Sequence, residues 1–240
     1  MNIPFPHIEN KITYTKTFLA ETSVKMFFAE SSFTEEVAKR LFRDSFGIEL
    51  SAENYKQLTL TKLKISDKDN GVYISFAKES IKIRVDQAHY SNFKLSMEPI
   101  LTNLVKGLPF GFEFSGLKVK KINVWPVISP TDSKNIKSRD EWFVLKRSVL
   151  SSEFGEKNEI SELESLAEFD NPPYGKVRLN SFLVIPDNEE MVGGIMLISN
   201  YDLFEDIKAS GIISETERMN NVLYDAYHWA VSQNVIDSMK

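Results

Sequence analysis

Residues 58–86 read LTLTKLKISDKDNGVYISFAKESIKIRVD. This stretch decides the fold because it contains three short segments of alternating apolar and polar residues, joined by two turns. The second run places Val72, Ile74 and Phe76 at alternate positions, and the third run alternates in the same way from Ile81 to Val85. Alternation with a period of two puts one set of side chains on a buried face and leaves the other set in water. The stretch therefore predicts an antiparallel meander with one covered face.

The first run and the two turns are less regular than the strands they join. The first run has apolar residues from Leu58 to Ile65, but their spacing changes near Lys62, which we interpret as a β-bulge. Asp69-Asn70-Gly71 in the first turn tolerates the positive φ values of a hairpin loop. Residues 78–80 form the second turn.

Two elements are predicted before the meander. Residues 12–29 are rich in Thr, Tyr, Phe and Val, which favours one long or broken strand. Residues 32–46 have the apolar spacing of a helix, with Ser32 and Glu35 as a capping box and Gly47 as the stop.

Two more elements follow the meander. Apolar residues at helical spacing predict a helix over residues 93–105, which begins late or is kinked because Pro99 lies inside it. Residues 117–128 alternate as a strand, with a break in the pattern at Lys120-Lys121.

The second half of the chain is predicted to contain three strands and a helix. The strands cover residues 142–150, 177–185 and 192–199, and a long helix runs from about residue 215 to residue 239. Ser214 and Glu217 have the spacing of a second capping box at the start of that helix.

These elements predict an α+β fold with an antiparallel-rich sheet and helices on one face. The first half matches a ferredoxin-like (split βαβ) order, and the second half reads as a smaller sheet with a long C-terminal helix. The polar stretch 129–139 is the best boundary. We therefore expect an α/β sandwich subdomain over residues 1–130 and a second sheet with its helix over residues 140–240, or one continuous domain.

Composition excludes several classes of chemistry. The chain has 240 residues, no cysteine and three scattered histidines, so disulfides, thiolate metal sites and cysteine nucleophiles are ruled out. It contains no phosphate-binding glycine loop, no Gly-x-Ser-x-Gly elbow and no His-Glu-x-x-His motif. The first residues lack the basic and apolar regions of a secretory signal, so we expect none, and the sequence has no apolar run of membrane-spanning length. We expect a cytoplasmic protein with no cofactor, no metal site and no membrane contact.

Charge is distributed unevenly along the chain. Residues 1–150 carry 23 Lys and Arg against 17 Asp and Glu, a net charge of +6, whereas residues 151–240 carry 6 against 17, a net charge of -11. Such an asymmetry indicates either a basic surface for a polyanion and an acidic surface for another protein, or two halves that neutralise each other. The acidic stretch 153–170 is either a docking segment for a basic partner or a solvated loop or short helix.

The densest basic region is the candidate binding site. Basic side chains neutralise phosphates and aromatic faces stack on bases, and Trp125, Trp142 and Phe143 lie among the lysines. The alternative is a solvated strand edge in which Lys discourages sheet pairing. The predicted binding residues are Lys118, Lys120, Lys121, Asn123, Lys134, Lys137 and Arg139.

One pair of residues has the spacing of an acid–base dyad. Asp225 and His228 are three positions apart on the predicted terminal helix, so they share one side of a turn. The functional interpretation is a histidine base oriented by a carboxylate. The alternative is a surface pair beside Trp229, because the sequence offers no nucleophile or third member.

Three segments, taken in order, resemble a family of bacterial proteins of unknown function that occurs sporadically across genomes. They are ITYTKTFLAETSVKMFF, VYISFAKESIKIRVDQAHYSNFKLSMEPILTNL and LYDAYHWAVSQNVIDSM. The family's Gly-x-Arg-Tyr-x-Asn segment corresponds here to residues 116–123, in which Asn123 matches and Lys120-Lys121 stand in place of Arg-Tyr. The family's patchy occurrence implies a setting in mobile elements or phage defence.

Three hypotheses for function follow. The first is a non-catalytic binding or adaptor protein in a bacterial, defence-related assembly, whose partner is another protein or a second copy of the chain. The second is an RNA- or single-strand-binding module that uses the basic region. The third is a carboxylate-dependent hydrolase or nuclease, which requires three or more acidic residues in one cleft. No catalytic residue is assigned from the sequence.

Overall fold

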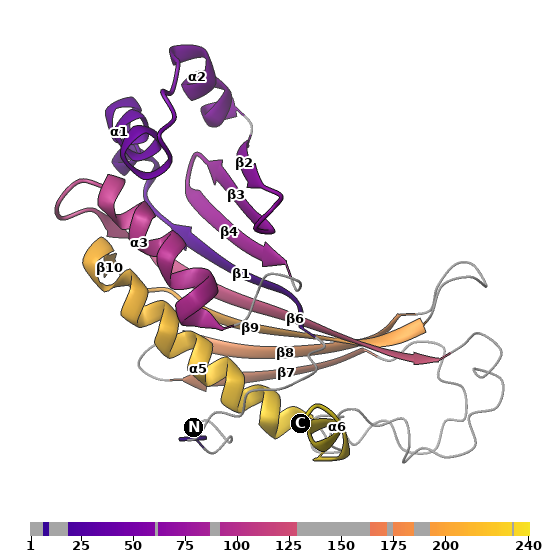
Figure 1. Ribbon diagram of the computed structural model, residues 1–240. Coiled ribbons are helices and arrows are strands. Elements are labelled where there is room, and N and C mark those ends of the chain that lie inside the picture. Colours follow the sequence, from indigo (N-terminus) through magenta and orange to yellow (C-terminus); the bar gives the residue numbers. More distant parts are fainter. Residues whose placement is uncertain are drawn as a thin grey trace.

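The computed structural model describes residues 7–9, 19–60, 62–86, 92–128, 164–171, 175–184, 193–231 and 233–240 (Figure 1). Its strands are β1 (Leu19–Phe27), β2 (Leu63–Asp67), β3 (Val72–Ala77), β4 (Ser80–Asp86), β5 (Glu113–Phe114), β6 (Gly116–Ile128), β7 (Glu164–Asn171), β8 (Gly175–Val184), β9 (Gly193–Leu203) and β10 (Ile207–Lys208). Its helices are α1 (Glu35–Phe46), α2 (Ala52–Leu60), α3 (Glu98–Gly107), α5 (Ile212–Ala230) and α6 (Gln233–Ser238), with short turns at η1 (Glu30–Ser32), η3 (Phe93–Met97) and η6 (Ala209–Gly211).

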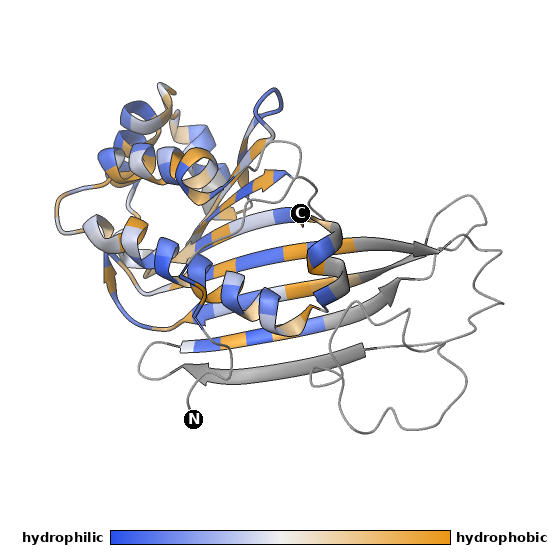
Figure 2. Cartoon of the chain, turned by 60° about the horizontal axis from the view of Figure 1, so that its bottom comes forward, coloured by the Kyte–Doolittle hydropathy of each residue, from blue (hydrophilic) through white to orange (hydrophobic). Residues whose placement is uncertain are grey.

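The large sheet is antiparallel throughout and has the strand order β2-β3-β4-β1-β6-β9-β8-β7. Its apolar and polar residues alternate along the strands, as Figure 2 shows. A second, two-stranded sheet joins β5 and β10. The α+β class and the antiparallel-rich sheet are therefore confirmed.

Two finer predictions differ from the structure. A split βαβ unit has a parallel strand pair, and every described pair here is antiparallel, so the ferredoxin-like detail is not confirmed. The strands predicted for a smaller second sheet instead extend the first sheet, because β6 pairs with β9 from Leu117 to Ile128.

The sheet has an internal two-fold order that the sequence does not reveal. In the first half, β1 pairs with the last strand of the β2-β3-β4 meander, and α3 follows. In the second half, β6 pairs with the last strand of the β7-β8-β9 meander, and α5 follows. Since β1 and β6 are antiparallel neighbours, a two-fold axis normal to the sheet relates the two arrangements.

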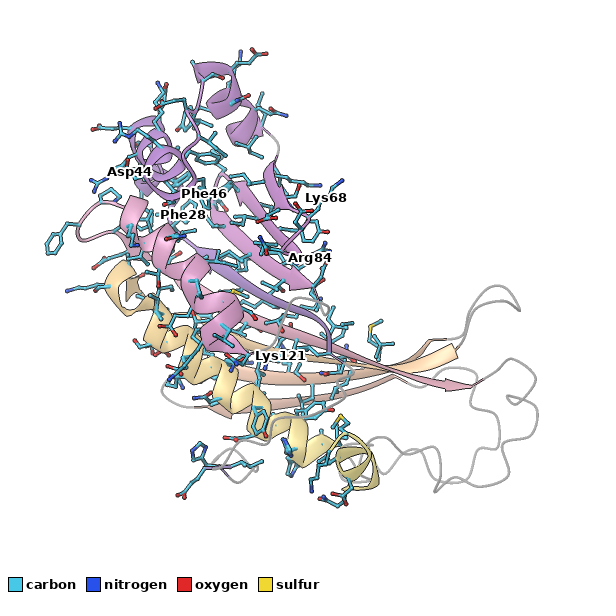
Figure 3. The ribbon with its side chains drawn as sticks, in the orientation of Figure 1. Phe28, Asp44, Phe46, Lys68, Arg84 and Lys121 are labelled. Carbon is cyan, nitrogen blue, oxygen red and sulfur yellow. The ribbon has the colours of Figure 1, made fainter. Side chains whose placement is uncertain are left out.

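Helices α1, α3 and α5 lie on one face of the sheet (Figure 1). Beneath them, Phe28 packs against Phe33 and Phe112, with ring centroids 4.7 and 6.0 Å apart. In a second aromatic group, the ring centroids of Phe42 and Phe76 are 4.5 Å apart. These aromatic side chains hold helices to sheet, and Figure 3 shows Phe28 and Phe46 in this layer.

Helices α1 and α3 cross closely because α3 ends in a glycine. A Cβ on Gly107 would lie 2.9 Å from the Cα of Leu41 and closer still to the Oγ of Ser45. Because Gly107 has only a hydrogen atom in place of a side chain, α3 can approach α1 this closely. Gly107 is the last residue of α3.

The start of the predicted meander is wrong. Residues 52–60 form α2 and β2 begins at Leu63, so the change in spacing near Lys62 marks a helix end and not a bulge. Strands β3 and β4 and the positive φ of 60° at Gly71 are confirmed. The pattern break at Lys120-Lys121 is not a bulge, because β6 keeps one register with β9 from Leu117 to Pro126. It marks the point where the apolar residues of β6 change from one face of the sheet to the other.

Both predicted capping boxes are wrong. The N-cap of α1 is Thr34, whose Oγ1 accepts a hydrogen bond from the Val37 amide, and Ser32 lies in the preceding turn. Helix α5 starts at Ile212, before Ser214, and Val231 separates it from α6. Gly47, with φ of 65°, ends α1 as expected.

Asp225 joins the N-terminal segment to α5. Its Oδ2 lies 2.9 Å from His7 Nδ1, and its Oδ1 accepts a hydrogen bond of 3.2 Å from the Ile8 amide. The Asp225 side chain is only 8 % exposed. The predicted Asp225–His228 dyad is therefore wrong about the partner, because the carboxylate faces a residue 218 positions earlier.

We expect Asp225→Ala to release the N-terminal segment. The variant loses two hydrogen bonds to a charged group, each worth about 1.5–3 kcal/mol when buried and less here, where His7 is largely exposed. The Ile8 amide should exchange with solvent at least about tenfold faster, measured by hydrogen exchange. Asp237→Ala on α6 is the control, and equal exchange of Ile8 in both variants would contradict the assignment.

Candidate anion-binding face

The side of the large sheet opposite α1, α3 and α5 carries most of its charged residues, and we call it the open face. Among the described residues no helix lies on it (Figure 1). Strand register places its side chains in two neighbouring rows across the strands. From β4 to β8, row one is Arg84, Ser23, Lys120, Asn200 and Arg178, and row two is Lys82, Lys25, Lys118, Asp202 and Lys176.

The two rows contain cations on β4, β1, β6 and β8. Neighbouring strands are about 4.8 Å apart, so the cationic stripe extends roughly 19 Å across the sheet. From β4 to β8, Asp202 is the carboxylate within the two rows, and the adjacent row adds Glu21 and Asp86. On the next strand, β7, the register places Glu168 opposite Arg178 and Asp170 opposite Lys176. The excess of positive over negative charge therefore lies on β4, β1 and β6.

Three carboxylates, those of Asp202, Glu21 and Asp86, neutralise part of the stripe, and that of Asp86 lies 3.5 Å from Arg84. Asp202, buried at 6 % exposure, forms an ion pair of 3.1 Å with Lys118 and a second ion pair with Arg178. Glu21 lies 3.6 Å from Lys82 and 3.9 Å from Arg84.

Lys25 and Lys120 remain without such neutralisation. In the described part of the chain, no carboxylate lies within ion-pair distance of either ammonium group. Partial burial lowers the pKa of Lys25, and Lys62, Lys118 and Lys82 lower it further. Burial also lowers the pKa of Lys120, where Lys82 and Lys118 act in the same direction and Glu21 opposes them. An anion at this position would relieve that repulsion.

Among the described residues, the buried Asn180 Oδ1 beside the rows makes no hydrogen bond. The Glu21 Oε1 and the Arg84 Nε also make no hydrogen bond there, although they lie at ion-pair distance from Lys82 (3.6 Å) and Asp86 (3.5 Å) respectively. Buried polar atoms normally have partners, and unsatisfied ones mark positions that a bound molecule or water can fill. All three lie on the open face.

Aromatic side chains flank the stripe at two corners. The Arg84 guanidinium lies 4.1 Å from the centroid of the Tyr73 ring on β3, and Figure 3 marks Arg84 on the sheet. At the other corner, the Lys25 ammonium lies 4.5 Å from the centroid of the Phe27 ring. Phe204, which is 72 % exposed, directly follows β9.

Gly116 separates the last two rings. A Cβ at this position would lie 3.0 Å from the carbonyl oxygen of Leu203, 3.6 Å from the Phe27 ring and 4.0 Å from the Cα of Phe204. Glycine therefore suits the close backbone approach of β6 to the end of β9, which brings Phe204 near Phe27. Lys25 and Lys118 lie in the adjacent row.

The structure separates the predicted binding residues. Lys118 and Lys120 lie on the open face, whereas Lys121 and Asn123 lie on the helix-covered face, beside Thr22 and Leu197 respectively (Figure 3). Lys121 and Asn123 are therefore not part of the open-face site, since successive residues of a strand point to opposite sides. The remaining predictions, Lys134, Lys137, Arg139, Trp142 and Phe143, lie outside the described residues.

Sequence reasoning missed Lys25, Lys82, Arg84 and Arg178 as members of the site. Lys82 and Arg84 stood on the predicted wet side of the meander, which was a usable signal. Lys25 and Arg178 reach the same surface only through the pairing of β1 with β6 and of β8 with β9. Of the predicted acidic loop, residues 164–170 instead belong to β7, and residues 153–163 lie outside the described chain.

No group of three or more His, Asp or Glu side chains suited to a metal ion occurs among the described residues. Within the same residues, no helix is long and apolar enough to cross a lipid bilayer. No family model, no curated protein and no solved structure matches this chain significantly.

Proposed function

We propose that this protein is a non-catalytic binding protein that holds a polyanionic partner on the open face of its sheet. The observation that carries the proposal is the cationic stripe, in which Lys25 and Lys120 are partly buried beside other lysines and form no ion pair among the described residues. Like charges held together reduce stability, so their retention is expected where a ligand neutralises them. We also propose that the protein is cytoplasmic and acts as an adaptor in a bacterial defence assembly.

The test is a titration of the protein against two polyanions, sodium polyphosphate and a fluorescently labelled deoxythymidine 12-mer. We expect both to bind at low ionic strength. The logarithm of the association constant should fall linearly with the logarithm of salt concentration, with a slope of about -0.7 for each phosphate contacted on a single strand. Absence of binding to both polyanions at 20 mM salt, measured by fluorescence anisotropy and competition, would overturn the proposal.

A further inference from the structure

We infer that the polyanion is a single-stranded nucleic acid, with bases that stack at the aromatic corners of the open face while its phosphates follow the cationic stripe. This inference rests on the proposed function and adds the class of partner. It depends on the aromatic rings of Phe204 and Tyr73, which carry no charge and so offer no charged partner to the carboxylates of an acidic protein or to inorganic polyphosphate.

The first step of the argument is the exposure of Phe204. An isolated phenylalanine with 72 % of its surface in water gains little from folding. Phe204 lies at the edge of the open face, one residue beyond Leu203, which pairs with Leu117 on β6. An aromatic ring there offers a base a stacking surface, because every base has a π-face.

The second step is the position of Phe204 beside the cations. Gly116 lets the backbone of β6 approach the end of β9 closely, and this approach places the Cα of Phe204 next to the strand that pairs with Phe27. Lys25 and Lys118 lie in the adjacent row, within reach of the phosphate that precedes or follows such a base. The base of one nucleotide can therefore stack on Phe204 while its phosphate lies beside Lys25 or Lys118.

The third step is the opposite corner. The Arg84 guanidinium already stacks on Tyr73, and a guanidinium plane is itself a stacking surface for an unpaired base. One corner lies on β3 and the other at the end of β9. These two strands are four strand spacings apart in the sheet, or roughly 19 Å. For comparison, single-strand-binding OB-folds contact about 4–16 nucleotides each.

The geometry favours a single strand over a duplex. Bases in a duplex are stacked on each other and expose only their edges in the grooves, so they cannot stack on Phe204 or Arg84. A protein reads duplex edges with an element that enters a groove, and the described open face consists of sheet residues. Only an unpaired strand can use both the aromatic corners and the cationic rows.

The experiment compares Phe204→Ala with Phe110→Ala, a matched control because Phe110 is fully exposed in the loop between α3 and β5. Fluorescence anisotropy measures binding of a deoxythymidine 12-mer, with polyphosphate of equal charge and a 12-base-pair duplex as competitors. Stacking is worth about 1–3 kcal/mol per base, which predicts roughly tenfold weaker oligonucleotide binding by Phe204→Ala. Polyphosphate binding should not change, and Phe110→Ala should leave both affinities unchanged.

Phe204→Trp keeps an aromatic ring and should restore oligonucleotide binding to at least the wild-type affinity. The inference is overturned if polyphosphate binds but Phe204→Ala leaves the oligonucleotide affinity unchanged while keeping a wild-type melting temperature. It is equally overturned if the duplex competes better than the single strand. Either result leaves the proposed polyanion binding intact, whereas failure of both polyanions to bind removes the proposed function itself.

Discussion

Replacement of Lys25 and Lys120 together by methionine should weaken oligonucleotide binding and raise the melting temperature at the same time. Each lysine that contacts a phosphate contributes about 0.7 to the salt slope, so the double variant should lose about 1.4 of that slope. At 50 mM salt this corresponds to roughly 50-fold weaker binding. Methionine keeps the unbranched aliphatic stem of lysine, which packs beside Phe27 in the case of Lys25.

The expected gain in stability has the same physical origin. Burial and neighbouring lysines lower the pKa of both side chains below the ordinary value of 10.5. The unfolded chain therefore binds more protons than the folded chain between the lowered pKa values and pH 10.5. The destabilisation is fully present below the lowered pKa values and disappears as the pH rises to 10.5.

Removal of both charges should thus stabilise the protein at neutral pH by no more than about 1 kcal/mol, since the groups are partly exposed. This corresponds to about 2–4 °C in melting temperature for a chain of this size. The difference between variant and wild type should shrink as the pH approaches 10.5. Differential scanning calorimetry at several pH values measures it.

The matched control is the double variant Lys94→Met and Lys106→Met, which makes the same change in net charge. Both lysines are exposed and lie on the helix side of the sheet, in η3 and α3. This control should keep most of the oligonucleotide affinity and show no gain in melting temperature. If both double variants lose affinity equally, net charge explains the binding and the open face does not.

Gly175→Ala is expected to destabilise the protein by about 3 kcal/mol or more. Gly175 has a φ of +134°, a conformation that alanine adopts only with strain of about 1–3 kcal/mol. In addition, a Cβ would lie 2.1 Å from the carbonyl oxygen of Asp202 on β9. The backbone of β8 or β9 must shift to relieve that overlap, which adds about 1–3 kcal/mol.

The same shift should affect the open face. The carboxylate of Asp202 holds both Lys118 and Arg178, so movement of its backbone disturbs two cations of the stripe. We expect the Gly175→Ala variant to unfold at lower urea concentration and, while still folded, to bind the oligonucleotide more weakly. Gly111→Ala is the control, because Gly111 has a φ of +79° but no atom within 4 Å of a Cβ. Equal losses of stability in the two variants would contradict the close contact.

The sequence by itself determined strands β3 and β4, the turn between them and which side of each strand is wet. Period-two alternation in residues 72–77 and 80–86 is a local property, and a tight turn fixes the pairing of such neighbours. Local pattern failed for residues 58–60, where the apolar positions suit both a strand and the end of α2.

Tertiary structure alone decided which strands became neighbours. Lys25 meets Lys118 because β1 pairs with β6, and Arg178 joins them because β8 pairs with β9. Asp225 binds His7 rather than His228 for the same kind of reason, since these partners are far apart in sequence. Such pairings depend on how buried faces of the two halves combine into one sheet, and no local period encodes that choice.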